Sequence, residues 1–241
     1  MTSFSRILFG LIGHPIEHSQ SPRLFKEYCI AHDPSMLKKS EYRLILEPDF
    51  DRAISVFVKD DAAINVTAPF KTRAYEWVVE QGAVTDPLCT MTKAVNCIIK
   101  GLDGSLRAYN TDCSAVASIL RSFNAGPATR VAIAGSGGAG RSAQAACRSL
   151  GIVPSVFNRT VRESGQKSLE ALAPALENCD ILIYTLPVGG ILRPSDIPSR
   201  VHVVEANYRD PHLDFHPLYT GGLEWLEEQG RICYEMFGKL L

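Results

Sequence analysis

The sequence has almost no net charge. Its 25 basic and 26 acidic side chains leave a formal net charge of −1. No surplus of either sign therefore attracts nucleic acid or an anionic membrane surface, and we expect neither partner. Hydrophobic residues make up 46% of the chain and charged residues 21%, which is ordinary for a globular protein.

Long hydrophobic runs and paired cysteines are also absent. The apolar run at residues 7–12 is too short to span a membrane and is followed by Gly13-His14-Pro15. We recognise no signal peptide or transmembrane segment and expect a cytoplasmic protein. The seven cysteines form no C-x-x-C pair, so reduced thiols are expected. His212-x-x-x-His216 has metal-like spacing, but it lies in a Pro-rich loop without a further ligand. We therefore expect a surface loop there and no metal.

Strand and helix signals alternate along both halves, which predicts two α/β domains with largely parallel sheets. Strands are expected at residues 7–12, 42–46, 62–66, 95–99, 106–109, 131–134, 155–158, 181–184 and 201–205. Helices are expected from residue 21, at 50–58, 69–79, 110–123, 138–150 and about 162–172, and from 222 to the end. We place a substrate-binding domain at residues 1–112 and a Rossmann-like domain at 113–241, joined by helices around a cleft. The last helix, about 222–241, is a candidate to pack back onto the first domain.

A glycine-rich turn lies between the expected strand 131–134 and the helix after it. It consists of Gly135, Ser136, Gly137, Gly138, Ala139 and Gly140. In such a turn the first glycine permits the tight bend, the second a close approach of pyrophosphate, and the third close packing of helix on strand. The helix N-terminus adds backbone donors and a partial positive charge. The pattern predicts a dinucleotide site.

The end of the next strand indicates which dinucleotide binds. Sites for NAD usually carry a carboxylate there, which binds the ribose 2′-hydroxyl. This chain instead has Asn158, Arg159 and Thr160, with Arg162 close by. A guanidinium can bind a 2′-phosphate with its planar fork, so NADP is favoured over NAD. The alternative is that Arg159 is a solvated residue at a helix start.

Four polar clusters fall at predicted junctions of strands and helices, where open α/β sheets bind ligands. Ser19 and Ser21 are suited to hold a small anion such as a carboxylate, although Ser21 alone reads as the N-cap of a helix with Pro22 at its first position. Lys71 falls in the first turn of a helix, where the dipole disfavours a positive charge, which suits proton transfer. An isolated lysine is usually a solvated surface group.

The other two clusters centre on amide and carboxylate groups. Asn96 interrupts an apolar, strand-like run, which is disfavoured unless its amide forms hydrogen bonds. Asn110-Thr111-Asp112 precedes a helix, and either Asn110 or Asp112 alone reads as an ordinary N-cap. Each cluster is a weak signal by itself.

Together these stretches resemble the shikimate dehydrogenase family over nearly the whole chain. The matching segments are residues 13–22, 65–71, 94–96, 110–112, 135–140, 158–160 and 222–229. The chain departs from the family pattern in Tyr184-Thr185-Leu186-Pro187-Val188-Gly189-Gly190, near the expected nicotinamide, and in Cys97, where the family usually has threonine. Each segment alone is a weak match, but the presence of all of them in the order found in the family makes the resemblance specific.

The resemblance implies an NADP-dependent reduction of 3-dehydroshikimate to shikimate. Lys71 and Asp112 match the family's catalytic pair. The residues that match its substrate-binding positions are Ser19, Ser21, Thr67, Asn96, Tyr208 and Gln229. Two alternatives stay open: a dehydrogenase of the same fold acting on quinate or another small hydroxy acid, and a silent dinucleotide-binding regulator. We expect a monomer or a homodimer.

Overall fold

The computed structural model describes residues 6–161, 164–187, 189 and 191–241. These residues fall into two compact units. The first unit comprises the chain up to Thr111 together with Gln229–Leu241, and the second comprises Asp112–Glu228. The chain passes from one unit to the other within α6 (Thr111–Ser122) and within α9 (Gly222–Gly238).

The first unit is built on a mixed sheet of six strands in the order β2-β1-β3-β5-β6-β4. Strands β1, β2 and β3 run parallel, and β5 is antiparallel to both β3 and β6. The strands expected at residues 95–99 and 106–109 therefore pair as a hairpin, which makes this sheet mixed. The elements are β1 (Ile7–Ile12), α1 (Ser21–His32), α2 (Met36–Lys39), β2 (Ser40–Ile45), α3 (Phe50–Asp60), β3 (Ala63–Val66), α4 (Lys71–Glu80), β4 (Val84–Thr85), α5 (Pro87–Thr92), β5 (Cys97–Lys100) and β6 (Leu106–Tyr109).

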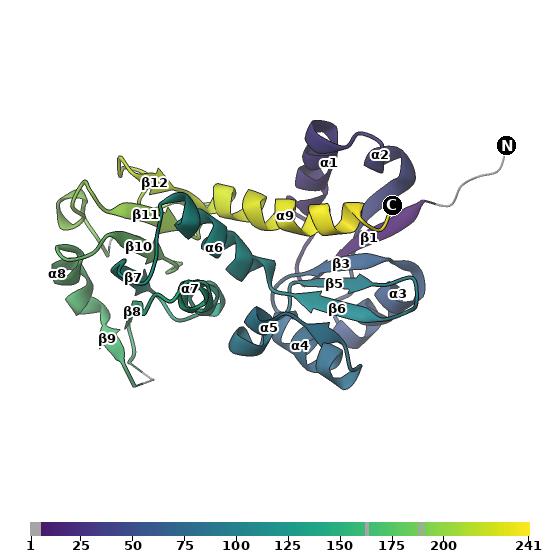
Figure 1. Ribbon diagram of the computed structural model, residues 1–241, viewed down its shortest axis with the longest axis horizontal. Coiled ribbons are helices and arrows are strands. Elements are labelled where there is room, and N and C mark those ends of the chain that lie inside the picture. The colour runs from purple at the N-terminus through teal and green to yellow at the C-terminus, as the bar shows by residue number, and fades with distance from the viewer. Residues whose placement is uncertain (1–5, 162–163, 188, 190) are drawn as a thin grey trace. The chain divides into compact units, whose positions relative to one another are not determined.

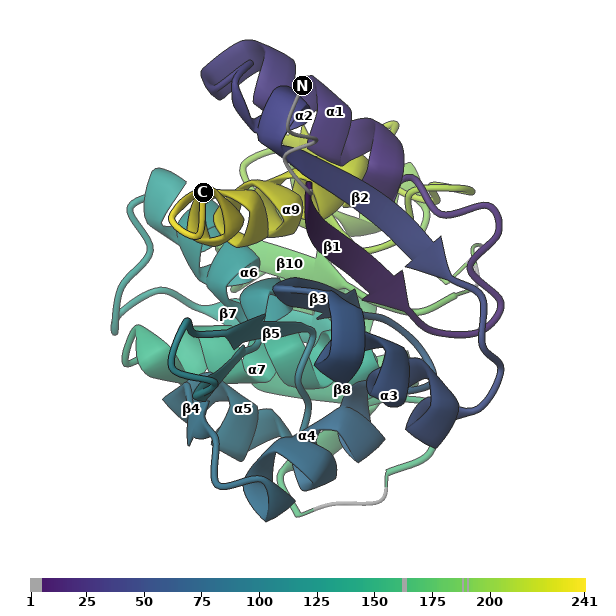
Figure 2. The same ribbon diagram turned by 90° about the vertical axis from the view of Figure 1, so that its right-hand side faces the viewer.

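The two faces of this sheet carry different helices (Figures 1 and 2). Helices α3, α4 and α5 cover one face, where their apolar side chains form a core with alternate strand residues such as Ile64 and Ile98. Helix α1 and the end of α9 cover the other, where Phe9 of β1 stacks on Phe237 of α9 with ring centroids 4.8 Å apart. Because successive strand residues point to opposite faces, Asn65 and Cys97 face α9.

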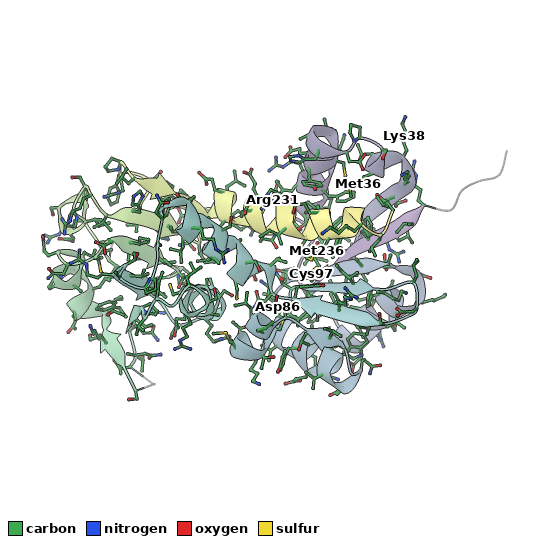
Figure 3. The ribbon with its side chains drawn as sticks, in the orientation of Figure 1. Met36, Lys38, Asp86, Cys97, Arg231 and Met236 are labelled. Carbon is green, nitrogen blue, oxygen red and sulfur yellow. The ribbon has the colours of Figure 1, made fainter. Side chains whose placement is uncertain are left out.

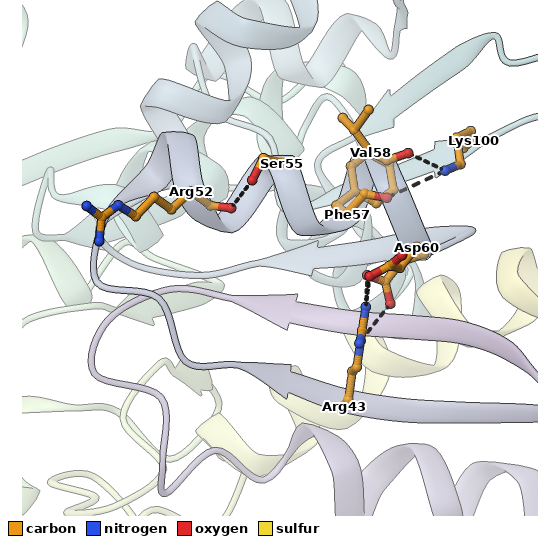
Figure 4. Close-up of polar contacts among 8 residues, drawn as sticks. Arg43, Arg52, Ser55, Phe57, Val58, Asp60 and Lys100 are labelled. Atoms are coloured by element: carbon orange, nitrogen blue, oxygen red, sulfur yellow. Dashed lines mark hydrogen bonds and ion pairs between the residues drawn. The ribbon is translucent and has the colours of Figure 1, made fainter.

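Polar contacts tie α3 to the neighbouring strands (Figure 4). Lys100 Nζ donates to the carbonyl oxygens of Phe57 (3.5 Å) and Val58 (2.9 Å). Arg43 of β2 binds the carboxylate of Asp61 with two hydrogen bonds of 3.1 and 2.8 Å, and the side chain of Asp61 is 0% exposed. A buried carboxylate is tolerated where such a pair compensates its lost hydration.

The second unit holds six strands that run parallel wherever they pair. Its elements after α6 are β7 (Val131–Ala134), α7 (Gly138–Ser149), β8 (Ser155–Asn158), β9 (Gln166–Ser168), η1 (Leu169–Ala171), α8 (Leu172–Leu176), β10 (Ile181–Tyr184), η2 (Pro194–Asp196), β11 (His202–Glu205) and β12 (Tyr219–Thr220). Their order is β12-β11-β10-β7-β8-β9. Counted along the chain from β7, this is the 3-2-1-4-5-6 order of a Rossmann fold.

The expected helix at about 162–172 is wrong. The described part of that range holds Gly165 with a φ of +89°, then strand β9 and the short helix η1. A positive φ interrupts a right-handed helix. The hydroxyl of Ser168 then accepts a hydrogen bond from Glu170 N and caps the turn that follows.

Candidate active site

Four loops of the first unit meet at one edge of its sheet. Ile12 and Val66, the last residues of β1 and β3, are register partners, so these two parallel strands end together. Cys97, the first residue of β5, pairs with Asn65 of β3 and with Tyr109, the last residue of β6. The segments that follow β1, β3 and β6 and the one that precedes β5 therefore lie at the same edge. This edge carries every predicted polar cluster of the first domain.

The two serines lie between β1 and α1. Ser19 Oγ donates to Ser21 Oγ at 3.2 Å and also accepts from Ser21 N at 3.3 Å. The expected N-cap role of Ser21 is wrong, because Gln20 is the N-cap residue and Ser21 begins the helix. The Ser21 hydroxyl thus does not serve as a helix cap. It sits beside Ser19 as part of a hydroxyl pair, the arrangement expected for holding a small anion.

Asn96, Thr111 and Gln229 form a second polar group at this edge. Asn96 Oδ1 accepts from Thr111 N at 2.7 Å, and Asn96 Nδ2 donates to Thr111 Oγ1 at 3.0 Å and to Gln229 Oε1 at 3.4 Å. Thr111 Oγ1 also donates to Gln229 Oε1 at 3.3 Å. Asn96 is 3% exposed, so its amide is held by these bonds. The sequence expectation that this amide must bond is confirmed.

Tyr42 and Cys233, which no sequence pattern singled out, connect the two serines to this polar group. Tyr42 OH donates to Asn65 Oδ1 at 2.8 Å, and Asn65 Nδ2 donates to Cys233 Sγ at 2.9 Å. Burial raises the pKa of Tyr42 well above its usual value, although a hydrogen bond with Ser21 opposes the shift. Tyr42 therefore remains a neutral phenol that can donate to Asn65. No short motif marks Tyr42 or Cys233.

Thr67 and Lys71 follow β3 at the same edge. Thr67 N donates to Ile12 O at 2.9 Å, which ties the two strand ends together. Lys71 begins α4, its side chain is half-buried, and its carbonyl oxygen accepts from Val95 N at 3.0 Å. Lys71 is thereby fixed to the segment that carries Asn96.

Asp112 and Tyr208 belong to the second unit. Asp112 lies in the first turn of α6, directly after Thr111, and Tyr208 is 42% exposed beneath the guanidinium of Arg209. The pairing of Asp112 with Lys71 stays a prediction, as does the contact of Tyr208 with substrate.

The glycine turn of the second unit links β7 to α7 as expected. Gly135 has a φ of +103°, and a Cβ there would lie 2.5 Å from Thr185 Oγ1. A Cβ on Gly140 would lie 2.3 Å from the carbonyl oxygen of Gly135. The fold itself therefore requires glycine at both positions. Thr185 comes from the unusual 184–190 segment, of which Val188 and Gly190 lie outside the described residues.

Gly137 and Gly138 are different, because a Cβ on either would meet no atom within 4 Å. Both are exposed, and Gly137 is the N-cap residue of α7 without a side-chain cap. The first turn of α7 holds no acidic residue. Open backbone at a helix N-terminus fits a bound phosphate group. The turn follows β7, which pairs with β10 at the point where the strand order reverses.

Asn158 joins the end of β8 to this turn. Its Nδ2 donates to Ser136 Oγ at 2.7 Å and to Thr160 O at 3.2 Å, while its Oδ1 accepts from Arg159 N at 3.1 Å. Arg159 and Thr160 are exposed. Arg162, the other basic residue expected to contact the cofactor, lies outside the described residues.

A buried carboxylate organises the loop that carries Tyr208. Glu205, at the end of β11, is 0% exposed. Its oxygens accept hydrogen bonds from Asn207 Nδ2, His212 N, Leu213 N and Tyr219 OH at 2.9–3.1 Å. Sequence reasoning missed Glu205, whose only signal was an acidic residue at the end of an apolar strand.

The two histidines with metal-like spacing contact different residues, and the ring of His212 lies against that of Tyr184. His216 is buried, against the expectation of a surface loop, and its ring contacts Pro198 O at 3.3 Å and Leu218 N at 3.2 Å. In the described part of the chain, no three His, Cys, Asp or Glu side chains gather as a metal would need. No helix among the described residues has the length and apolar character needed to cross a membrane.

These features define a class: a two-unit α/β protein with a Rossmann-type dinucleotide turn in one unit and a polar sheet edge in the other. Residues 11–98 match the family model of the shikimate dehydrogenase substrate binding domain. The chain is 31% identical over 227 residues to the shikimate dehydrogenase (NADP(+)) of Ignicoccus hospitalis, covering 89% of this chain and 81% of that one. The chain belongs to the shikimate dehydrogenase family.

Solved structures share the fold. The shikimate dehydrogenase of Aquifex aeolicus superposes with a TM-score of 0.82 at 21% identity, covering 99% of this chain and 95% of that one. A quinate dehydrogenase from Corynebacterium glutamicum in complex with NAD gives a TM-score of 0.79 at 17% identity, covering 97% and 94%. Two α/β domains, the second of them Rossmann-like, are thus confirmed as the fold class.

Proposed function

We propose that this protein catalyses the reversible, NADP-dependent reduction of 3-dehydroshikimate to shikimate. The observation that carries the proposal is the convergence of Ser19, Ser21, Asn96 and Gln229 on one sheet edge of the first unit. Their hydroxyl and amide groups suit a small molecule that bears a carboxylate and several hydroxyls. The relative from Ignicoccus hospitalis, named as an NADP-dependent shikimate dehydrogenase, supports the same activity.

The paired serine hydroxyls hold the carboxylate in this proposal, and the amides of Asn96 and Gln229 hold ring hydroxyls, with Thr67 beside them. Lys71 lies at the same edge and delivers the proton to the carbonyl oxygen during reduction, and it accepts that proton during oxidation. Asp112 sets the charge and position of Lys71, and Tyr208 contacts the substrate.

The cofactor is assigned to the turn Gly135–Gly140 and to the end of β8. The open backbone at Gly137 and Gly138 binds the pyrophosphate. Asn158 Nδ2 donates to Ser136 Oγ at 2.7 Å and so orients this hydroxyl. Arg159 and Thr160, which are exposed, bind the 2′-phosphate. When bound, NADPH supplies the hydride for the reduction.

A four-way assay tests the proposal. The purified protein is incubated with NADP⁺ and shikimate, NADP⁺ and quinate, and NAD⁺ with each, and the absorbance of reduced nicotinamide is followed. We expect the fastest turnover with NADP⁺ and shikimate. Faster turnover with quinate would support the sibling dehydrogenase, and NADP⁺ binding without turnover on either acid would support a silent regulator.

Lys71→Ala tests the assigned proton transfer. Loss of a general acid–base group lowers turnover about 100-fold or more, while the affinity for NADP⁺ stays within about twofold of wild type. Lys59→Ala, which removes an exposed lysine of α3 in the same unit, is the matched control and keeps wild-type turnover. An unchanged rate in Lys71→Ala refutes the role.

A further inference from the structure

A thiol lies at the centre of the polar network. Cys233 follows Gln229 by one helical turn on α9, so the two side chains share a helix face, and Cys233 is 0% exposed. Its Sγ accepts from Asn65 Nδ2 at 2.9 Å and lies 3.2 Å from Thr111 Oγ1. Burial, and after it the neighbouring Cys233, raises the pKa of the thiol of Cys97, the residue labelled in Figure 3 at the start of β5.

The donors and acceptors in this cluster are matched. Thr111 has one hydroxyl hydrogen, and the carbonyl oxygens of Asn96 (3.2 Å) and Gln229 (3.3 Å) both lie within its reach. The contact between Thr111 and Cys233 is therefore satisfied when the thiol donates to the hydroxyl oxygen. Cys233 thus accepts from Asn65 and donates to Thr111, which in turn bonds Asn96 and Gln229.

We propose that Cys233 is a positioning residue: its buried thiol orients Asn65 and Thr111, and through Thr111 the amides of Asn96 and Gln229, toward the substrate. The inference deepens the proposed function and rests on it. Asn65 cannot make up for the loss of its bond to Cys233, because its second amide hydrogen already binds Asn96 O (3.4 Å) and its oxygen binds Tyr42. An apolar side chain at position 233 leaves two buried polar groups short of a partner.

Steady-state kinetics on three variants test this role. In Cys233→Ala we expect KM for shikimate to rise about tenfold, the effect of about one lost hydrogen bond, while kcat changes less than about threefold. Cys233→Ser, which still donates and accepts, should keep KM within about threefold of wild type. Cys29→Ala is the matched control, because it removes a buried thiol of α1 in the same unit.

Other results overturn the proposal. A purely structural role would lower kcat in proportion to the folded fraction and leave KM unchanged. Equal KM values in wild type and Cys233→Ala, or a serine variant as impaired as the alanine variant, refute positioning by the thiol.

A second readout does not depend on turnover. In ¹⁵N correlation spectra, the side-chain amide signals of Asn65 and Asn96 should shift in Cys233→Ala and stay in place in Cys29→Ala. Unmoved signals refute the inference even if shikimate is turned over. Absence of turnover in the wild type refutes the proposed function, and the amide signals still decide whether Cys233 orients these side chains.

Discussion

Replacing Glu205 with glutamine tests how the second unit fixes the loop that carries Tyr208. The substitution keeps the size and shape of the side chain but turns one acceptor oxygen into an NH₂ donor. Oε1 accepts from Asn207 Nδ2 (3.1 Å) and His212 N (2.9 Å), and Oε2 accepts from His212 N (3.0 Å), Leu213 N (3.1 Å) and Tyr219 OH (3.0 Å). Whichever oxygen is replaced, at least one half-buried or buried donor then faces another donor.

The size of the effect follows from these bonds. A buried donor left unsatisfied costs about 1–3 kcal/mol, and bonds to a neutral acceptor are about half as strong as bonds to a charged one. Burial and the nearby carboxylate raise the pKa of Tyr219, so its phenol stays a donor at neutral pH. We expect Glu205→Gln to lower the free energy of unfolding of the second unit by about 3 kcal/mol.

Urea unfolding followed by circular dichroism measures the global loss, and hydrogen exchange locates it. The amides of His212 and Leu213 should exchange about 100-fold faster in the variant, which corresponds to about 3 kcal/mol. Glu177→Gln, at an exposed glutamate of the same unit, is the control and should change stability by less than about 0.5 kcal/mol. An effect as small as the control's in Glu205→Gln would refute the reasoning.

Three further predictions follow from other contacts of the second unit. Arg159→Ala should weaken NADP binding about tenfold to 100-fold in calorimetry and leave NAD binding within about twofold; equal losses contradict a role in reading the 2′-phosphate. Gly140→Ala should destabilise the protein by about 2–3 kcal/mol in urea, since its Cβ meets a backbone oxygen at 2.3 Å. Gly137→Ala should change stability by less than about 0.5 kcal/mol and weaken NADP binding. A destabilised Gly137→Ala would contradict the assignment of Gly140 to the fold and of Gly137 to the cofactor. Asp180 accepts from Arg130 at 2.6 Å, and this contact lowers the pKa of the carboxyl, so its contribution is present above about pH 4 and is lost as the pH falls through the folded-state pKa. Because the pair is half-exposed, Asp180→Asn should cost at most about 1 kcal/mol at pH 7 in urea titrations, and a cost that persists at pH 2 would exclude this linkage.

The fold could be predicted where apolar runs are continuous. The strands at 131–134 and 181–184 were expected and occur at those residues, because a parallel strand covered on both faces requires an unbroken apolar run. The short edge strands β4, β9 and β12 were missed. Each has only two or three residues, and pairing with a neighbour rather than local pattern makes them strands.

The candidate site could be predicted only in part. Polar clusters in the sequence marked Ser19 and Asn96, and the family resemblance marked Gln229. The register of β1, β3 and β5 brings the segments that carry the first two to one edge. Nothing local marked Cys233, whose partner Asn65 is 168 residues away. Such a contact depends on how α9 packs on the sheet, which periodicity alone does not give. The roles assigned to the site residues stay predictions.

The division of the first unit between two distant segments has a consequence for synthesis. Residues 6–111 leave the ribosome first, but the sheet face that carries Phe9 and Cys97 is covered only by α1 until Gln229–Phe237 have been made. The second unit, which is continuous in sequence, can fold in the interval. The nascent chain therefore carries an apolar surface through the translation of more than a hundred residues, and the substrate-side network closes only when α9 is added.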